Sequence, residues 1–330
     1  MHILIVRLGS IGRHHLSLLQ ALDPVPRITV WRRAGSAPDG VATVHDLASA
    51  LAAKPDAAFL CGPASEHIAI ARQLAEHGIH LFIEKPISDR LDGVAELIEF
   101  CAARRVVLAV GYCLRFHPAI AGLRDAIAAG AIGRVLHAQA EVGQPLPDWR
   151  AAGGPPVAGA VAALGGGVLL ELSHEIDLLC WLLGRPSAVY ASLARLGDST
   201  VDVEDCADLL LEWPGGARGT IHLDWLSRPS RRSCTVIGTK GTLRANLMTG
   251  ALDLHAGHGR NLVPPAPDRI GQTYPAEIVH FLDCIATGAQ PTISGTAALD
   301  ALAVAMAAKD SAASGQLQLV STATLVKPRS

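Results

Sequence analysis

The chain opens with a strand, a glycine-containing turn, a helix and a second strand, and this order constrains the fold more than any other feature. Residues 3–6 form a continuous apolar run, which is typical of a strand buried on both faces of a parallel sheet. Gly9 and Gly12 follow, then a helix to about Leu22 and a strand over residues 27–31. Together they form a βαβ unit, which predicts an α/β fold with a doubly wound parallel sheet.

The turn matches most of the dinucleotide fingerprint G-x-G-x-x-G. In that motif the second glycine admits a pyrophosphate to the backbone and the third lets helix and strand pack closely, and Gly9 and Gly12 stand at these places. Arg7 stands at the first place, where a glycine normally eases the turn. We expect Arg7 to keep a β-region backbone and to weaken nucleotide binding by its bulk, although its guanidinium could instead contact a phosphate. Ser10 and Ile11 complete the expected cofactor-binding turn.

The second strand ends in Trp31 and is followed by Arg32 and Arg33, where an NAD-type pattern has an acidic residue for the ribose 2′-hydroxyl. Two guanidinium groups there suit the 2′-phosphate of NADP(H). Two solvated arginines after a strand are the alternative interpretation. The sequence therefore favours NADP(H), with NAD(H) as the alternative cofactor.

The alternation of helices and strands continues to about residue 111. Helices are expected over 46–53, 65–77 and 91–104, and strands over 57–61, 79–83 and 106–111. Because 330 residues exceed what one hydrophobic core usually serves, we expect two domains, over residues 1–116 and 117–330. A hydrophobic fraction of 50% against 18% charged residues is ample for such cores and excludes general disorder.

Lys85 directly follows one of these strand ends, in the sequence Glu84-Lys85-Pro86. The carboxyl ends of parallel strands are where ligands bind in such sheets. A lysine there can polarise a carbonyl or alkoxide oxygen and donate a hydrogen bond to it. A surface lysine in a loop is the alternative.

A second candidate group lies between Gly165 and Leu183, where we expect one continuous helix. At 100° per residue, Glu171, His174 and Asp177 share the side opposite to an apolar face. Such a stripe is either a solvated face or a site with an imidazole and two carboxylates. The three glycines that begin the segment favour the second reading, because they let a ligand or another backbone approach closely.

Charge and cysteine usage restrict the partners. A net charge of −2, with 28 basic and 30 acidic residues well mixed, predicts neither a nucleic-acid nor a membrane partner and favours a small-molecule substrate. The seven cysteines form no Cys-x-x-Cys pair and are expected to be reduced core residues. The chain starts directly with an apolar strand, so we expect a cytoplasmic location. The fourteen histidines are too scattered to predict a metal site.

Taken together, the motifs resemble the glucose-fructose oxidoreductase/inositol dehydrogenase/rhizopine catabolism (Gfo/Idh/MocA) family over most of the chain. The lysine motif and the histidine segment are specific in combination. The segments that carry the resemblance are Gly9 with Gly12, Glu84-Lys85-Pro86, Gly111-Tyr112, Arg115 to Pro118, Gly165 to Asp177, Val203 to Asp205, Ile237 to Leu243, and Tyr274 to Gly288.

The resemblance implies a Rossmann domain followed by an α/β domain with a large, mostly antiparallel sheet, which binds substrate and often forms homo-oligomers, here a dimer or tetramer. It implies hydride transfer between NAD(P) and a sugar, nucleotide sugar or polyol. The family's lysine and histidine map onto Lys85 and His174, and its upstream carboxylate onto Glu171, three residues before the histidine instead of the commoner four. The further cofactor-binding residues expected on this basis are Cys61, Pro63, His67, Glu84, Lys85 and Arg115.

Relatives that share the pattern of residues 143–149 usually continue with a tyrosine- and arginine-containing segment that reaches the active site. This chain instead has an alanine-, glycine- and proline-rich stretch over 151–160, which offers no polar side chain, so substrate contacts have been lost or moved. Asp224 and Trp225 belong to an expected hairpin over 207–213 and 218–225 and could line a sugar site, although sheet surface or a subunit interface is the commoner role. The expected substrate-binding residues are Lys85, Tyr112, Trp149, His174, Asp224 and Trp225.

The expected mechanism uses His174 to exchange a proton with the reacting oxygen and Lys85 to stabilise its developing charge, with Glu171 or Asp177 orienting one of them. Two other functions remain open at this stage. Arg7 and the depleted 151–160 stretch are compatible with a cofactor-sensing or scaffold protein, and NAD-assisted glycosidic cleavage is a different enzyme class on the same fold.

Overall fold

The computed structural model describes residues 1–38, 40–146, 158–197, 201–257, 260–264 and 270–321. Contacts divide the chain into two units. Among the described residues, the first contains Met1–Gly111 together with Glu277–Leu299, and the second contains those of Tyr112–Ala276 and residues 300–321. The first boundary thus falls slightly before residue 116, and the return of 277–299 to the first unit is a feature that the sequence did not predict.

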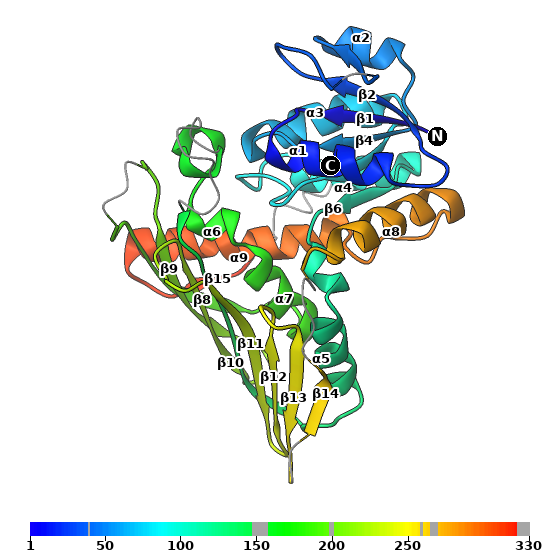
Figure 1. Cartoon of the computed structure of the whole chain (residues 1–330). Helices are drawn as coiled ribbons and strands as arrows, with labels where there is room; N and C mark the ends of the chain where they lie inside the picture. The colour runs from blue at the N-terminus through cyan, green and yellow to red at the C-terminus, as the bar shows by residue number, and fades with distance from the viewer. Residues whose placement is uncertain (39, 147–157, 198–200, 258–259, 265–269, 322–330) are drawn as a thin grey trace. The chain divides into compact units, whose positions relative to one another are not determined.

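The first unit is built on a six-stranded parallel sheet in the order β3-β2-β1-β4-β5-β6 (Figure 1). This order is the one of doubly wound dinucleotide-binding folds and confirms the Rossmann prediction. Every residue of β1 and β4 is buried, in agreement with their continuous apolar sequences. The strands are β1 (His2–Val6), β2 (Arg27–Trp31), β3 (Ala42–Val44), β4 (Ala57–Leu60), β5 (His80–Ile83) and β6 (Leu108–Val110).

Helices of the first unit lie on both faces of this sheet (Figure 1). Asp46 caps α2 by accepting a hydrogen bond from the amide of Ser49 at 2.7 Å, which explains where that helix begins. The observed bounds agree with the expected helices to within three residues, whereas the three-residue strand β3 was not predicted because it carries too little pattern. The helices are α1 (Ser10–Gln20), α2 (Leu47–Ala52), α3 (Ala64–Glu76) and α4 (Val94–Arg104).

An aromatic cluster explains why residues 277–299 belong to the first unit. Phe59 of β4 and Phe82 of β5 stack with ring centroids 4.7 Å apart. Phe281, from the helix α8 (Thr273–Thr287), meets both rings edge-on, at 5.6 and 5.5 Å. All three side chains are fully buried. A segment far along the chain therefore completes the core of the nucleotide-binding unit.

The second unit is built on a nine-stranded sheet in the order β14-β13-β12-β11-β7-β10-β9-β8-β15. Only the β7–β10 pair is parallel, and the other named pairs are antiparallel, which confirms the expected mostly antiparallel sheet. The strands are β7 (Val135–Gly143), β8 (Ala188–Ala194), β9 (Cys206–Glu212), β10 (Arg218–Asp224), β11 (Arg231–Gly238), β12 (Thr242–Asn246), β13 (Ala251–His255), β14 (Arg260–Val263) and β15 (Gln318–Leu319).

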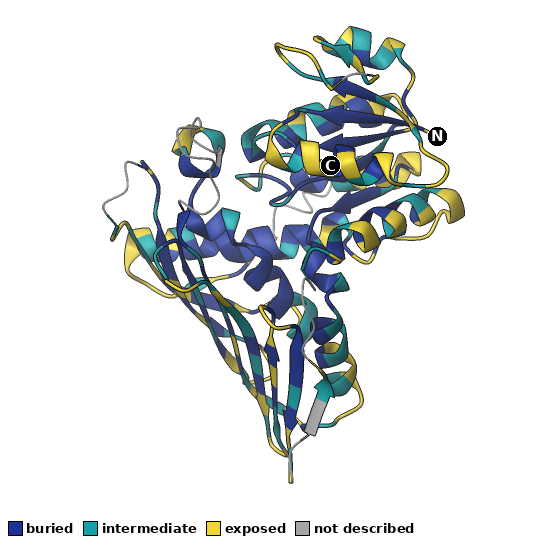
Figure 2. Ribbon diagram, viewed as in Figure 1, coloured by how far each residue is buried: buried dark blue, intermediate teal, exposed yellow. Residues whose placement is uncertain are grey.

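Helices pack against one face of this sheet, α5 on β12 to β14 and α7 on β7 (Figure 1). Burial alternates along the strands, so the opposite face carries exposed residues that include Tyr190, Leu210 and Ile237 (Figure 2). Within the described residues, no helix is both long and apolar enough to span a membrane. The helices are the short 3-10 helices η1 (Cys113–Phe116), η3 (Ala158–Ala160) and η4 (Ala162–Leu164), with α5 (Pro118–Ala128), α6 (Val168–Glu171), α7 (His174–Leu183) and α9 (Gly295–Ser314).

Candidate active site

The glycine turn between β1 and α1 has the geometry that its motif predicts. Gly9 is the N-cap of α1, and a Cβ atom added there would meet nothing within 4 Å. A Cβ at Gly12 would instead lie 2.5 Å from the carbonyl oxygen of Arg7. Gly9 thus leaves open space for a ligand at the start of the helix, and Gly12 allows the helix to pack closely on the strand. The amides of Ser10 and Ile11 lie in the first turn of α1, whose positive dipole end favours a phosphate group.

Arg7 departs from its expected backbone conformation. Its φ is +73°, in the left-handed region, so the prediction of a β-region backbone was wrong. The tight turn requires this conformation even though the residue is not glycine. The guanidinium points to α3, where Nη2 and Nε donate to Oε2 of Glu66 at 2.6 and 3.1 Å. Arg7 therefore has a carboxylate partner without any ligand.

Both arginines after β2 also have partners within the first unit. Nη2 of Arg33 donates to Oε1 of Glu66 at 2.7 Å, so this single carboxylate joins Arg7 and Arg33. Nη1 of Arg32 donates to the carbonyl oxygen of Ser36 at 2.6 Å. The guanidinium of Arg33 is 77% exposed and keeps donors directed to solvent. Glu66 therefore pairs with two of the three arginines, and Arg32 is held by a backbone carbonyl group.

The left-handed backbone of Arg7 gives a stability prediction with an internal control. Arg7→Gly and Arg7→Ala both remove the ion pair with Glu66, but only glycine adopts a positive φ without a Cβ clash. We expect the free energy of unfolding, measured in urea, to be higher for Arg7→Gly than for Arg7→Ala by about 1 kcal/mol or more.

The same two variants test what the Arg7 side chain does to the cofactor. If its bulk obstructs the pyrophosphate, both variants should bind nicotinamide dinucleotide more tightly than the natural protein in titration calorimetry. Weaker binding by both would show that the guanidinium contacts a phosphate, and equal stability of the two variants would contradict the strain argument.

Lys85 lies in a turn that buried polar contacts hold. Nε2 of His15 in α1 lies 2.5 Å from Oε1 of Glu84, and both residues are buried. The amide of Lys85 donates to Oε2 of the same carboxylate at 3.3 Å. A Cβ at Gly111 would lie only 3.1 Å from Glu84, so the absence of a side chain there makes room for this carboxylate. Glu84, an expected cofactor-binding residue, thus positions the backbone of Lys85.

His67 joins two of the turns at the carboxyl ends of the strands. Its Nδ1 lies 3.0 Å from the carbonyl oxygen of Pro86, and its Nε2 lies 3.0 Å from that of Gly62. Burial lowers the pKa of His67, so the ring is neutral near pH 7 and donates to one of the two carbonyls. Cys61, at the end of β4, is a buried thiol whose pKa burial raises, and Pro63 is the N-cap of α3. These residues line the edge where a parallel sheet binds its ligand.

The three glycines before His174 leave room for other parts of the protein to approach the backbone closely. Gly165 and Gly167 have φ values of +79° and +120°, which favour glycine. A Cβ at Gly166 would clash with the carbonyl oxygen of Gly159, and one at Gly167 would clash with the Glu204 carboxylate. Oε1 of Glu204 accepts a hydrogen bond from the amide of Leu169 at 3.3 Å. The close approach that the glycines predict is therefore made by backbone and by a carboxylate at the start of α6.

The expected single helix is two helices. Helix α6 ends at Glu171, and Leu172 and Ser173 separate it from α7, which begins at His174. The periodicity could not reveal this break because apolar residues continue through it. A Cβ at Gly159 would clash with the Glu171 side chain, so this side chain packs against η3. Glu171 and His174 therefore lie on different helices and share no helical stripe.

Nor is the polar side of α7 a solvated face. His174 is 8% exposed and Asp177 is 1% exposed. Nη2 and Nε of Arg115, in η1, donate to the two carboxylate oxygens of Asp177 at 2.6 and 2.9 Å. Burial raises the pKa of Asp177, and the nearby Arg115 opposes that rise. Asp177 and Arg115 thus form a buried ion pair that fixes α7, and their expected roles in catalysis and in cofactor binding stay predictions.

A second buried ion pair was not predicted. Nε and Nη2 of Arg232, in β11, donate to the two carboxylate oxygens of Glu175 at 2.7 and 3.0 Å. Glu175 is 1% exposed. A signal existed, because an acidic residue beside Ile176, Leu178 and Leu179, on a helix that is apolar on most sides, requires a cationic partner. The two bidentate pairs, to η1 and to β11, fix the rotation of α7 about its axis.

Tyr112 packs directly against His174. The two ring centroids are 5.5 Å apart and the rings meet edge-on at 82°. The phenol donates to Oγ of Ser173 at 3.3 Å, and burial raises the pKa of Tyr112 well above its usual range. Tyr112, expected to bind substrate, is 1% exposed, so in this structure its contacts orient the imidazole.

Asp224 and Trp225 do not present open ligand-binding groups. Asp224 is 2% exposed, and its carboxylate accepts hydrogen bonds from two backbone amides, from the Ser227 hydroxyl at 2.7 Å, and from His222 at 2.9 Å. Trp225 is 3% exposed. These contacts give Asp224 a structural role at the end of β10. Trp149 lies outside the described residues.

The site residues form two groups, one in each unit. Lys85, with the glycine turn and the arginines, belongs to the first unit, and His174, with Glu171 and Tyr112, belongs to the second. The first group suits a dinucleotide at the carboxyl edge of a parallel sheet. The second group offers the imidazole of His174, which can exchange a proton and which neighbouring side chains hold in place.

Family comparisons agree with this division. Residues 1–112 match an oxidoreductase family with an NAD-binding Rossmann fold, and residues 120–244 match the GFO/IDH/MocA C-terminal domain. The chain is 28% identical over 328 residues to inositol 2-dehydrogenase of Rhizobium meliloti (strain 1021), covering 92% of this chain and 94% of that one. It is also 28% identical over 272 residues to scyllo-inositol 2-dehydrogenase (NAD(+)) of Bacillus subtilis (strain 168), covering 79% and 76%.

Solved structures share the fold. The WlbA dehydrogenase from Bordetella pertussis, in complex with NADH and UDP-GlcNAcA, superposes with a TM-score of 0.84 at 24% identity, covering 97% of this chain and 99% of that one. Levoglucosan dehydrogenase, in complex with NADH and levoglucosan, gives a TM-score of 0.85 at 22% identity with the same coverage. The family models, the sheet order and the glycine turn agree, and the chain belongs to the Gfo/Idh/MocA family of pyridine-nucleotide-dependent oxidoreductases.

Proposed function

We propose that this protein oxidises a hydroxyl group, or reduces the corresponding carbonyl group, of a sugar, nucleotide sugar or polyol. The related proteins are named for inositols, and the similar structures contain UDP-GlcNAcA or levoglucosan. The observation that carries the proposal is the fixed position of His174 at the start of α7, next to Tyr112 and on a helix that two buried ion pairs hold. Such a rigid imidazole suits proton exchange with a bound hydroxyl.

His174 acts as the general base in oxidation and as the general acid in reduction. The edge-on contact with Tyr112 limits rotation of the imidazole, and the ion pairs of Glu175 and Asp177 hold the helix that carries it. Glu171 is the remaining carboxylate of the expected set and lies at the end of α6, two residues before α7 begins. Glu171 assists His174 in the proton exchange. Asp177 acts indirectly, because its ion pair with Arg115 holds helix α7.

Lys85 donates a hydrogen bond to the reacting oxygen and stabilises the negative charge that develops there. Its position is supported by Glu84 and His15, which hold the backbone of the turn after β5. A bound nicotinamide supplies or accepts the hydride.

The nucleotide is expected to bind at the glycine turn, where Gly9 leaves open space beside the first turn of α1. Within this proposal, NADP(H) is preferred to NAD(H). Arg32 and Arg33 follow β2, and Glu66 compensates only part of the positive charge there. An added phosphate would find guanidinium donors without repulsion from an acidic side chain at the end of β2.

Arg32→Ala should narrow the difference in binding free energy between NADP(H) and NAD(H) by about 1–3 kcal/mol, because a charge-assisted hydrogen bond would be lost. Fluorescence titration of both cofactors measures this difference. Arg72→Ala is the matched control, since Arg72 pairs with Glu76 on the exposed side of α3. Equal affinity of the natural protein for both cofactors would discard the preference.

The function itself is tested by incubating the purified protein with NAD⁺ or NADP⁺ and a panel of inositols, aldoses, anhydrosugars and UDP-sugars, and following reduced nicotinamide by absorbance. We expect at least one of these polyhydroxylated compounds to be oxidised. Tight cofactor binding with no turnover across the panel in either direction would contradict the proposal and favour a sensing role.

We further propose a cytoplasmic homo-oligomer that associates through the open face of the nine-stranded sheet. Tyr190 and Leu210 are opposite one another on β8 and β9, and both are more than 40% exposed. Exposed apolar side chains at adjacent sheet positions favour burial against a second copy. None of the seven cysteines forms a disulfide, which suits a reducing compartment. Light scattering of the purified protein tests the assembly.

A further inference from the structure

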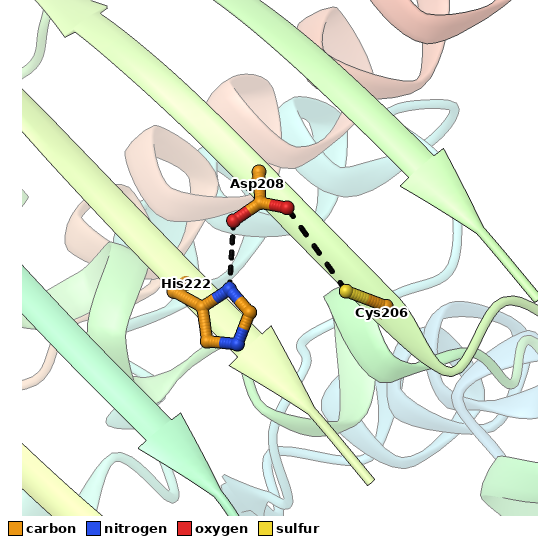
Figure 3. A group of neighbouring side chains, drawn as sticks. All are labelled: Cys206, Asp208 and His222. Carbon is orange, nitrogen blue, oxygen red and sulfur yellow. Dashed lines mark hydrogen bonds and ion pairs between the residues drawn. The ribbon is translucent and has the colours of Figure 1, made fainter. Parts of the chain in front are cut away.

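Three metal-ligating side chains converge on the open face of the large sheet (Figure 3). Cys206 and Asp208 belong to β9, and His222 belongs to the adjacent strand β10. Nδ1 of His222 lies 2.7 Å from Oδ1 of Asp208, and Sγ of Cys206 lies 4.0 Å from Oδ2 of the same carboxylate. One ligand atom from each residue can be chosen so that all three lie within 4.8 Å of one another.

The sheet itself produces this convergence. Cys206 and Asp208 are two residues apart on one strand, so their side chains emerge on the same face. Asp208 is directly opposite His222 in the antiparallel β9–β10 pair. The three ligands therefore stand on two hydrogen-bonded strands in the middle of a sheet, which limits their movement and lowers the cost of organising them around an ion.

Asp224 lies against one ring nitrogen of His222 and leaves the other nitrogen available to bind a metal ion. Its buried carboxylate accepts from the Ser227 hydroxyl and from backbone amides, and lies 2.9 Å from Nε2 of His222. A carboxylate held in this way keeps a proton on Nε2 and leaves Nδ1 facing Asp208. The 2.7 Å contact between Nδ1 and Asp208 is a hydrogen bond when Nδ1 also carries a proton, and a metal ion bound by both groups would replace that proton.

We propose that Cys206, Asp208 and His222 bind one divalent transition-metal ion of the Zn²⁺ class, with Asp224 as a positioning residue. A sulfur, a nitrogen and an oxygen donor suit Zn²⁺ or Co²⁺ and suit neither Mg²⁺ nor Ca²⁺, which take oxygen ligands. Binding releases the thiol proton of Cys206 to solvent, and the thiolate and carboxylate together balance the charge of the ion. The Asp208 side chain is 62% exposed in the single chain, so the fourth position is open to water, or to a group of a second copy where this face forms the interface.

Cobalt titration of the full-length, chelator-treated protein tests this site. One equivalent of Co²⁺ should give visible absorption of a tetrahedral site and a near-ultraviolet band from the bond between sulfur and cobalt. Zn²⁺ should abolish both by displacement. Cys206→Ser should remove the near-ultraviolet band, and Asp208→Asn and His222→Gln should weaken Co²⁺ binding by at least tenfold.

Asp224→Asn tests the positioning role, because it should keep the near-ultraviolet band while weakening binding about 10- to 100-fold. His137→Gln, a half-buried histidine on the same face of β7, is the matched control and should change nothing. Circular dichroism verifies the fold of each variant, and the exposed Asp208 provides a variant that leaves the buried residues intact. A missing sulfur–cobalt band, or unchanged affinity in both Asp208→Asn and His222→Gln, would overturn the site.

Discussion

Replacing His174 by alanine should lower the turnover number about a hundredfold or more, because the reacting oxygen loses its proton donor and acceptor. Lys85→Ala should cause a loss of similar size, since the developing charge on that oxygen loses a cationic hydrogen-bond donor. Neither change removes a residue of the glycine turn, so the nucleotide should still bind. Steady-state kinetics on a substrate identified from the panel, together with cofactor titration, measures both effects.

Two exposed residues provide matched controls for these variants. His255→Ala, at the end of β13, and Lys240→Ala, in the turn between β11 and β12, should each retain normal turnover. Near-normal turnover of His174→Ala would show that the proposed mechanism is wrong. A joint loss of turnover and cofactor binding would instead indicate that the variant is misfolded, which circular dichroism would reveal.

Asp177→Ala should reduce the free energy of unfolding by about 3–5 kcal/mol, the usual cost of leaving one member of a buried ion pair without its partner. Arg115 would remain buried, with a side chain only 3% exposed and its principal counter-charge removed. Urea unfolding should show a lower midpoint with an unchanged slope. Turnover should also fall where the protein remains folded, because α7 carries His174.

A control variant separates the loss of stability in Asp177→Ala from the general effect of removing a carboxylate. Glu76→Ala removes one half of the exposed pair between Arg72 and Glu76 on α3 and should cost no more than about 0.5 kcal/mol. The double variant Arg115→Met with Asp177→Leu removes both buried charges and should recover much of the lost stability. A loss below about 1 kcal/mol in Asp177→Ala would contradict the buried-pair interpretation.

The parts of the fold that the sequence predicted depend on local patterns. The buried strands are continuous apolar runs, and Gly9 and Gly12 have one backbone role each, so β1, the turn and α1 could be placed without knowledge of distant residues. The ends of the strands could be predicted for the same reason, and so could the position of Lys85 in the turn after β5. The hairpin β9–β10 was likewise visible from alternation and a glycine-containing turn.

What could not be predicted are the partners of charged residues far apart in the chain. Arg115 and Asp177 are separated by 62 positions, and Arg232 and Glu175 by 57. The local sequence can indicate that a carboxylate on a mostly apolar helix needs a cationic partner, but it does not show which distant arginine supplies it. For the same reason Asp177 was assigned to catalysis, and Glu66, which joins Arg7 and Arg33, was overlooked.

Because Phe281 lies late in the chain, the core of the first unit can be completed only late during synthesis. The nucleotide-binding unit is interrupted by the second unit, and its core includes Ile278 and Phe281 packed with Phe59 and Phe82. At translation rates of about 5–20 residues per second, these two residues emerge from the ribosome roughly 8–34 s after Gly111. During that interval Phe59 and Phe82 lack the aromatic partner that later covers them, which makes this part of the nascent first unit prone to aggregation.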